Sequence, residues 1–441
     1  MAQLDKNEVL VRQAKAVLDF NWTGEYTMPG PRLYPHQWSW DSAFVALAYS
    51  RYDQVRAMRE LRHLFEAQWK NGLLPQIVFN PRFTNYFPAP NFWHAKESPD
   101  APPHRETSGV VQPPLHATAA LHVYRHSGKE PGAKEFLEYA FAKLKAWHAY
   151  LYRERDPRGE GLVYIRHPWE SGMDNSPMWD EIMQRIHLRA GQIPRYRRAD
   201  IHTVSAADRP TSTAYDRFAY LVKLFADRGY DEDKVREDCP FLVQDVLFNS
   251  ILCKANRDLA EIARVLGEDP SSHEELAEKT KGAINERLWD EDRGTYLDYD
   301  LADERHICVY FGPNLAGPLY AGIPGQNRAK RMLDTLENDG FGLSGENITP
   351  IPSYDLHGYG FSDERYWRGP VWINIDWFLM HGLVAYGYEE HAGRLRETIV
   401  ELCRSEGFNE YFDPTSGEGL GSILFSWSAA LLLDVLMDEG R

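Results

Sequence analysis

The chain has 441 residues, of which 43% are hydrophobic and 26% are charged, and its formal net charge is −16 at pH 7. A chain of this length and composition can bury a large core, so intrinsic disorder is not expected. The acidic balance argues against nucleic acid as a partner, because a negative surface repels the phosphate backbone. An anionic small substrate would need arginines placed locally.

Helical periodicity dominates the chain. Between residues 53 and 69, apolar side chains such as Leu61, Phe65 and Trp69 recur three or four positions apart, which predicts one buried helix face. Similar patterns predict further helices over 7–19, 40–49, 114–125, 136–151, 215–226, 245–266, 272–288, 367–385, 390–403 and 421–437. Gly267 is expected to end the helix over 245–266. Only 295–299 and 347–354 suggest strands, so an all-α fold is expected.

Long loops rich in aromatic residues, proline and glycine interrupt the helices, chiefly over 79–112 and 166–212. Long ordered loops in a compact domain are usually functional. Their alternation with helices predicts antiparallel helix pairs with the loops collected at one end. With no fixed repeat and no low-complexity linker, we expect a single domain over 1–441.

Several features concern the location of the protein and its cofactors. The four cysteines are scattered without metal-type spacing, which is typical of buried thiols in a reducing compartment. The N-terminal segment is amphipathic and lacks the apolar core of a secretory signal. No apolar run is long enough to span a membrane. We therefore expect a cytoplasmic protein with no membrane partner and no metal or other cofactor. A homo-oligomer is possible.

The loop WESGMDNSP at 169–177 places two acids, Glu170 and Asp174, in a turn opened by Gly172. A carboxyl group held against Trp169 can have its pKa raised by desolvation. A general acid that works near neutral pH requires such a shift. The alternative is that Asp174 only shapes the turn.

A second acid stands among aromatic residues in FNEYFDP at 408–414. Glu410 lies there in a segment too short for a helix, and the alternative is a solvated side chain. The sequence alone cannot place Glu410 opposite Asp174.

Three further motifs are rich in aromatic or cationic residues. YPHQWSWD at 34–41 precedes a predicted helix, which Asp41 could simply cap. In the motif YWRGPVW at 366–372, two tryptophans flank an Arg-Gly-Pro turn. RPTSTAYDR at 209–217 puts Arg209, Tyr215 and Arg217 within reach of an anion, although Arg209 could instead pair with Asp208 or Asp216 on a solvated loop.

Together these motifs resemble glycoside hydrolase family 63, and the chain looks most like the bacterial branch that hydrolyses glucosylglycerate or mannosylglycerate. The resemblance extends over nearly the whole chain and is carried by YPHQWSWDSAF, QWKNGLLPQIVF, TSGVVQPP, WESGMDNSPMWD, RPTSTAYDR, YWRGPVW and FNEYFDPTSGEGLGS. Phe425 departs from the glucosylglycerate-type pattern, which has glutamine near this position. The choice between a glucosyl and a mannosyl substrate therefore stays open.

The resemblance implies an (α/α)6 barrel, or toroid, whose active site lies at the loop-rich end. It implies inverting, metal-independent hydrolysis of a small α-glycoside of glycerate, with Asp174 as general acid and Glu410 as general base. The implied substrate-binding residues are Tyr34, Trp40, Asp41, Tyr86, Gln112, Trp169, Gly172, Arg209, Tyr215, Tyr366, Trp367 and Trp372.

Other functions fit the sequence less well. Terpene and prenyl enzymes with a helical toroid need an Asp-rich metal cluster or a zinc site, and neither pattern occurs. A sugar-binding protein without catalysis would keep the tryptophans but would not need Asp174 and Glu410 in exposed turns. The main alternative is a family 63 exo-α-glucosidase that acts on neutral α-glucosides or oligosaccharides.

Overall fold

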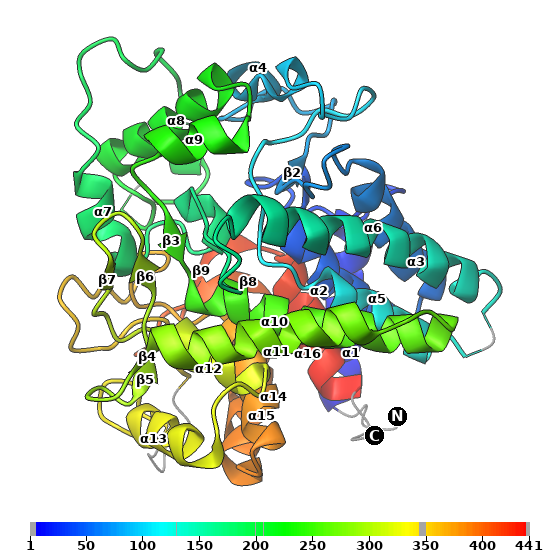
Figure 1. Ribbon diagram of the computed structural model, residues 1–441. Coiled ribbons are helices and arrows are strands. Elements are labelled where there is room, and N and C mark those ends of the chain that lie inside the picture. Colours follow the sequence, from blue (N-terminus) through cyan, green and yellow to red (C-terminus); the bar gives the residue numbers. More distant parts are fainter. Residues whose placement is uncertain (1–5, 129, 199, 206, 344–349, 438–441) are drawn as a thin grey trace.

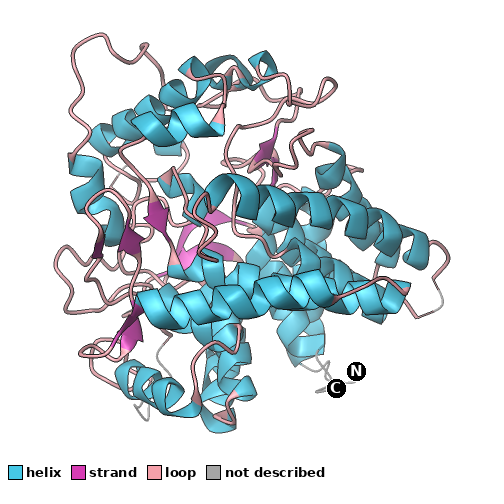
Figure 2. Cartoon of the chain, in the orientation of Figure 1, coloured by secondary structure: helices cyan, strands magenta, loops and turns pink. Residues whose placement is uncertain are grey.

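The computed structural model describes residues 6–128, 130–198, 200–205, 207–343 and 350–437, and this part of the chain is mostly helical (Figures 1 and 2). The α-helices are α1 (Lys6–Asn21), α2 (Ser39–Ser50), α3 (Gln54–Glu66), α4 (Pro90–Trp93), α5 (His116–His126), α6 (Ala133–Arg155), α7 (Asp180–Gln184), α8 (Ser212–Asp227), α9 (Glu232–Asp238), α10 (Val246–Leu266), α11 (Ser271–Ala283), α12 (Gly312–Tyr320), α13 (Gln326–Leu336), α14 (Ile373–Ala385), α15 (Glu389–Ser405) and α16 (Ser426–Met437). Short helical turns occupy Ala95–Glu97, Pro168–Ser171, Pro177–Trp179, Asp200–His202 and Ile284–Leu288.

The strands are short and antiparallel. They are β1 (Gln37–Trp38) with β2 (Ile77–Val78), β3 (Val243–Gln244) with β6 (Tyr299–Asp300) and β7 (Arg305–His306), β4 (Trp289–Asp290) with β5 (Thr295–Tyr296), and β8 (Asn409–Phe412) with β9 (Gly419–Ile423). The most extensive pairing joins β8 and β9, where Tyr411 lies opposite Leu420. It holds the segment that contains Glu410.

Six helices contact one another in a closed order. Helix α2 packs on α5, α5 on α10, α10 on α12, α12 on α14, α14 on α16, and α16 returns to α2. A second set packs against them: α1 on α16, α3 on α2 and α5, α6 on α5 and α10, α11 on α10, α13 on α12, and α15 on α14 and α16. The first and last described helices are therefore neighbours (Figure 1).

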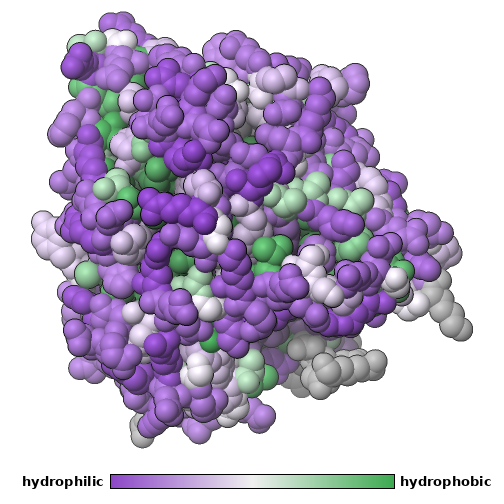
Figure 3. All heavy atoms as spheres, in the orientation of Figure 1, coloured by the Kyte–Doolittle hydropathy of each residue, from purple (hydrophilic) through white to green (hydrophobic). Residues whose placement is uncertain are grey.

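The sequences of the helices explain this arrangement. Every residue of α2 is buried, as expected for a helix that is apolar nearly all round and has neighbours on all sides. Helix α10 is amphipathic; Asp245 caps its N-terminus through the amide of Phe248, and Gly267 ends it in the left-handed conformation. Figure 3 shows a largely hydrophilic face, in keeping with the acidic composition. Among the described residues, no helix has the length and apolar character needed to cross a membrane.

Most predicted helices are present, but several boundaries differ. The predicted helix over 367–385 begins only at Ile373, because Gly369 and Pro370 keep the preceding segment in a loop. The predicted helix over 421–437 begins at Ser426, because residues 419–423 form β9. Within the predicted strand over 295–299, Thr295–Tyr296 and Tyr299 fall in two separate strands. Of the predicted strand over 347–354, residues 347–349 lie outside the described part, and the remainder forms only isolated bridges.

Candidate active site

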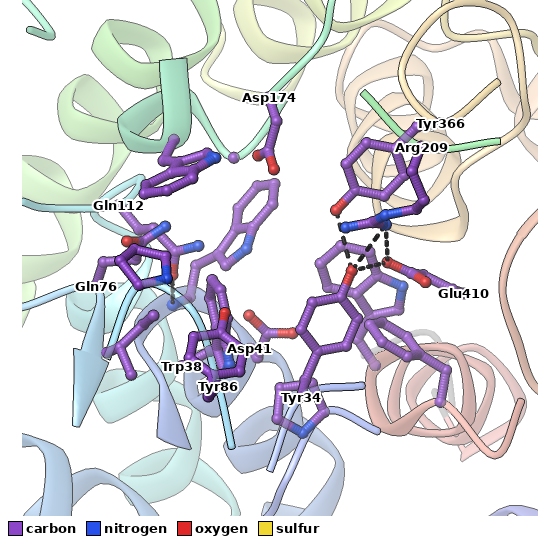
Figure 4. A pocket seen from close by; sticks show the side chains of 18 of the residues that line it. Tyr34, Trp38, Asp41, Gln76, Tyr86, Gln112, Asp174, Arg209, Tyr366 and Glu410 are labelled. Atoms are coloured by element: carbon purple, nitrogen blue, oxygen red, sulfur yellow. Dashed lines mark hydrogen bonds and ion pairs between the residues drawn. The ribbon is translucent and has the colours of Figure 1, made fainter. Parts of the chain in front are cut away.

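A pocket lies at the ends where α2 and α16 begin, and Figure 4 shows its side chains converging. Its lining residues are Pro29, Tyr34, Trp38, Trp40, Asp41, Gln76, Ile77, Tyr86, Pro88, Gln112, Trp169, Gly172, Asp174, Arg209, Tyr215, Tyr366, Glu410, Phe425 and Trp427. We call it the active-site pocket. It contains three carboxyl groups and one arginine.

The two acids of the 169–177 loop have different environments. Glu170 is fully buried and forms ion pairs with Arg155 and Arg166, with a shortest distance to Arg155 of 3.0 Å. Arg155 and Arg166 hold the pKa of Glu170 below its usual value, against the opposing effect of burial. Its carboxylate also accepts the backbone amides of Val111 and Arg166. Glu170 therefore anchors the loop and is not free for catalysis.

Asp174 instead lines the active-site pocket. Burial raises its pKa to about 7; the nearby Arg209 opposes this shift and Glu410 adds to it. Gly172, two residues earlier, has a φ of 76°, and a Cβ added there would lie 2.5 Å from a ring carbon of Trp40. The turn that presents Asp174 therefore requires glycine at this position. Asn175 fixes the other side of the turn by accepting the backbone amide of Trp367.

Glu410 lies on β8 and is buried, with 1% of its surface exposed. One carboxylate oxygen accepts a 2.6 Å hydrogen bond from the Tyr34 hydroxyl, and the other accepts the amide of Ser422 on β9. A terminal nitrogen of Arg209 stands 3.9 Å away. Burial raises the pKa of Glu410, while Arg209 and the bonds from Tyr34 and Ser422 oppose the rise.

Arg209 is buried and joins several groups of the pocket. Its Nη1 donates to the Tyr34 hydroxyl at 3.1 Å, its Nε donates to Asp200 at 3.3 Å, and its guanidinium lies 4.1 Å from the Tyr366 ring centroid. Its acidic partner is thus Asp200, not Asp208 or Asp216 on a solvated loop. Figure 4 shows Arg209, Tyr34 and Glu410 linked on one side of the pocket, with Asp174 apart from them.

The remaining polar groups come from other elements. Asp41 lies in the first turn of α2, whose N-cap position is Trp38, so Asp41 is not the cap. Burial raises the pKa of Asp41 well above its usual range, which favours the neutral carboxylic acid. Gln112 accepts the backbone amide of Trp40. These groups suit hydrogen bonds to a polyhydroxylated ligand.

Of the site residues that the family resemblance implied, only Trp367 and Trp372 do not line the active-site pocket. Their rings stack in parallel 3.8 Å apart, and both are almost fully buried. Trp372 donates its indole N–H to the backbone oxygen of Tyr366. Both tryptophans contact Tyr366 and therefore hold it in position at the pocket wall. Arg217 also lies outside this pocket, and its Nε donates to the backbone oxygen of Ile186.

Known proteins resemble this chain in sequence and in structure. The model of the family described as "Mannosylglycerate hydrolase MGH1-like glycoside hydrolase domain" matches residues 34–428. The chain is 66% identical to the mannosylglycerate hydrolase of Rubrobacter radiotolerans over 98% of each chain. It is 34% identical to the glucosylglycerate hydrolase of Mycolicibacterium hassiacum over 97% of each chain.

A solved structure leads to the same family. The crystal structure of a family 63 mannosylglycerate hydrolase from Thermus thermophilus, in complex with Tris and D-glycerate, superimposes with a TM-score of 0.89. The two proteins are 41% identical, and the alignment covers 96% of this chain and 99% of the other. The chain belongs to glycoside hydrolase family 63. This membership confirms the resemblance inferred from the sequence motifs.

In this family 63 chain, some pocket residues were not predicted individually. They are Pro29, Trp38, Gln76, Ile77, Pro88 and Trp427. Trp38 and Gln76 lie inside motifs that carry the family resemblance. Trp38 stands two positions before Trp40 at the start of α2, and this proximity to a predicted site residue was the signal that could have identified it. No group of three or more His, Cys, Asp or Glu side chains within the described ranges could hold a metal ion.

Proposed function

We propose that the chain hydrolyses an α-glycoside of glycerate, either mannosylglycerate or glucosylglycerate, to the free sugar and glycerate. The proposal rests mainly on one observation: two carboxyl groups with different surroundings line the same pocket. It is supported by the relatives, which are named as hydrolases of these two compounds. The aromatic lining suits the apolar faces of a sugar ring.

The surroundings of the two carboxyl groups suggest their roles. Asp174, with a pKa of about 7, keeps a proton near neutral pH and can give it to the departing glycerate oxygen as general acid. Glu410 is held by Tyr34 and Ser422 and faces a cation, which favours a carboxylate that can accept a proton from water. Inversion requires the two carboxyl groups to stand about 6.5–9.5 Å apart, with a water between base and sugar.

The remaining lining residues then divide between sugar and glycerate. Trp40, Asp41, Gln112, Trp169 and Gly172 would surround the sugar, with neutral Asp41 donating a hydrogen bond to a hydroxyl. Tyr34, Tyr86, Arg209, Tyr215 and Tyr366 would contact the glycerate end. A guanidinium can bind a carboxylate with two parallel hydrogen bonds. Since Arg209 also contacts Tyr34 and approaches Glu410, it would couple glycerate binding to the position of the base.

We also propose that the closed order of α2, α5, α10, α12, α14 and α16, with the second set packed against it, is an (α/α)6 barrel. The whole chain would form one catalytic domain, with the loops over 79–112 and 166–212 at the active-site end. Two carboxyl groups can perform glycoside hydrolysis unaided, so the proposed reaction needs no metal.

A substrate panel tests the function. Purified protein is assayed on mannosylglycerate, glucosylglycerate, kojibiose, nigerose and trehalose, with Asp174→Asn and Glu410→Gln variants as controls. We expect hydrolysis of one or both glycerate glycosides, reduced at least about a hundredfold in each variant. Turnover of the neutral disaccharides alone would identify a family 63 α-glucosidase and contradict the proposal.

A further inference from the structure

A second hollow lies against the glycerate end of the active-site pocket. Its lining residues are Pro31, Arg32, Leu33, Tyr34, Pro35, Arg82, Phe83, Thr84, Asn85, Tyr86, Phe87, Asp200, Thr203, Arg209 and Tyr215. Tyr34, Tyr86, Arg209 and Tyr215 line both cavities. We call this second cavity the outer hollow. The shared residues form the boundary between the two.

The outer hollow is lined by an excess of positive charge. Its charged residues are Arg32, Arg82, Arg209 and Asp200. Asp200 is already neutralised, because Arg198 binds it through two nitrogens and Arg209 approaches it at 3.3 Å. In the described part of the chain, no carboxylate forms an ion pair with Arg32 or Arg82, and both are exposed.

The positive charge of the outer hollow contrasts with the negative charge of the protein as a whole. The chain carries a net charge of −16, and the active-site pocket contains a single arginine, which already lies close to Glu410. A carboxylate approaching the pocket is therefore repelled at long range by the acidic surface. Two unpaired guanidinium groups beside the boundary residues would oppose this repulsion locally, because a concave site concentrates their field.

We propose that the outer hollow is a capture site for small carboxylates, in which Arg32 and Arg82 select substrates whose aglycone is anionic. The carboxylate is held there before it reaches Arg209 at the boundary. This inference rests on the proposed function, because it assigns a role in recognising the same anionic substrate. Arg32 and Arg82 are specificity residues and take no part in bond cleavage.

The test compares two substrates that differ in one charge. They are the α-glycoside of glycerate that the wild type cleaves and the corresponding α-glycoside of glycerol, which lacks the carboxylate. The ratio of kcat/KM for the two is measured for wild type, Arg32→Ala/Arg82→Ala, Arg32→Lys/Arg82→Lys and Arg32→Glu/Arg82→Glu. Arg12→Ala/Lys134→Ala is the matched control, since both residues are exposed, line neither cavity and remove the same total charge.

We expect the alanine pair to lower the ratio about 3–10-fold at low ionic strength, through KM, which is at or below the low end of electrostatic steering effects because both arginines are exposed. The glutamate pair should lower it further, and the lysine pair should retain it. The effect should shrink at about 0.5 M NaCl, because salt screens exposed charges beyond a few ångströms. If the wild type barely cleaves the glycerol glycoside, the same comparison is made with glycerate and glycerol as inhibitors.

The possible failures are distinguishable. A ratio that is the same in the alanine pair, the glutamate pair and the control pair overturns the capture site while leaving the proposed function intact. An equal fall of the kcat/KM ratio in the lysine and alanine pairs also overturns the capture site, since the shape of the loops and not their charge would then determine the selectivity. A wild type that cleaves no glycerate glycoside contradicts the proposed function itself.

Discussion

Replacing Asp174 with asparagine should stabilise the fold at alkaline pH while removing activity. The pKa of Asp174 is about 7 in the folded protein, against 3.8 without the protein environment. Between these two values the folded state binds more protons than the unfolded state, so this group makes the wild type less stable as pH rises. Each pKa unit corresponds to about 1.4 kcal/mol, which gives an upper limit of about 4 kcal/mol above pH 7. Because solvent reaches part of the side chain, we expect about 1–4 kcal/mol.

The assay is denaturant unfolding of the wild type and Asp174→Asn at several pH values from about 4.5 to 8. The difference in free energy of unfolding should move in favour of the variant as pH rises and should level off above about pH 7. Other carboxyl groups titrate in both proteins, so to first order they cancel in this difference. A pH-independent difference, or a variant that loses stability relative to wild type at high pH, would show that Asp174 has no raised pKa and would remove the physical basis for its role as general acid.

Three further predictions concern other groups. Glu170→Gln should destabilise the fold by about 3–5 kcal/mol in denaturant unfolding, because it removes one of the two buried carboxylates that pair with Arg155 and Arg166 and leaves only Glu232. The matched exposed variant Glu291→Gln should change little, and equal effects would contradict the anchoring role. Arg209→Ala should lower kcat/KM for the glycerate glycoside by an amount that corresponds to about 2–5 kcal/mol of lost transition-state stabilisation. It should also lower kcat through the Tyr34–Glu410 contact, and a wild-type kcat would exclude that coupling. Exhaustive EDTA treatment should leave turnover unchanged; complete loss that a divalent ion restores would contradict the two-carboxylate mechanism.

The sequence predicted those parts of the fold in which local pattern and tertiary environment agree. Helix α10 combines an apolar face, an aspartate cap and a terminal glycine, so its limits could be placed closely. Helix α12 was not predicted, because its interior contains Gly317 and Pro318, which are both unfavourable in isolated helices. Its burial between α10 and α14 outweighs that propensity. The pairing of β8 with β9 was also missed, since strand partners depend on tertiary position.

The candidate site was predicted through motifs, and its geometry was not. Glu170 and Asp174 stand four residues apart in one turn, and the motif alone does not distinguish them. Two buried arginines assign Glu170 to structure: Arg155 at the end of α6, and Arg166, which lies four residues before Glu170 but whose contact with it depends on the fold of the loop. Trp367 and Trp372 belong to an aromatic motif that is typical of a sugar-binding platform. The fold instead turns their rings against each other and leaves Tyr366 to line the pocket. A motif places residues near a site but does not orient their side chains.

The most direct test of the central claim is a proton NMR time course of the purified protein with mannosylglycerate and, separately, glucosylglycerate. It follows the released glycerate and the anomer of the sugar that appears first. Single displacement by water, with Asp174 as acid and Glu410 as base, predicts glycerate together with the β-anomer, which then equilibrates in solution. No release of glycerate from either substrate, or the α-anomer as the first sugar formed, would contradict the account.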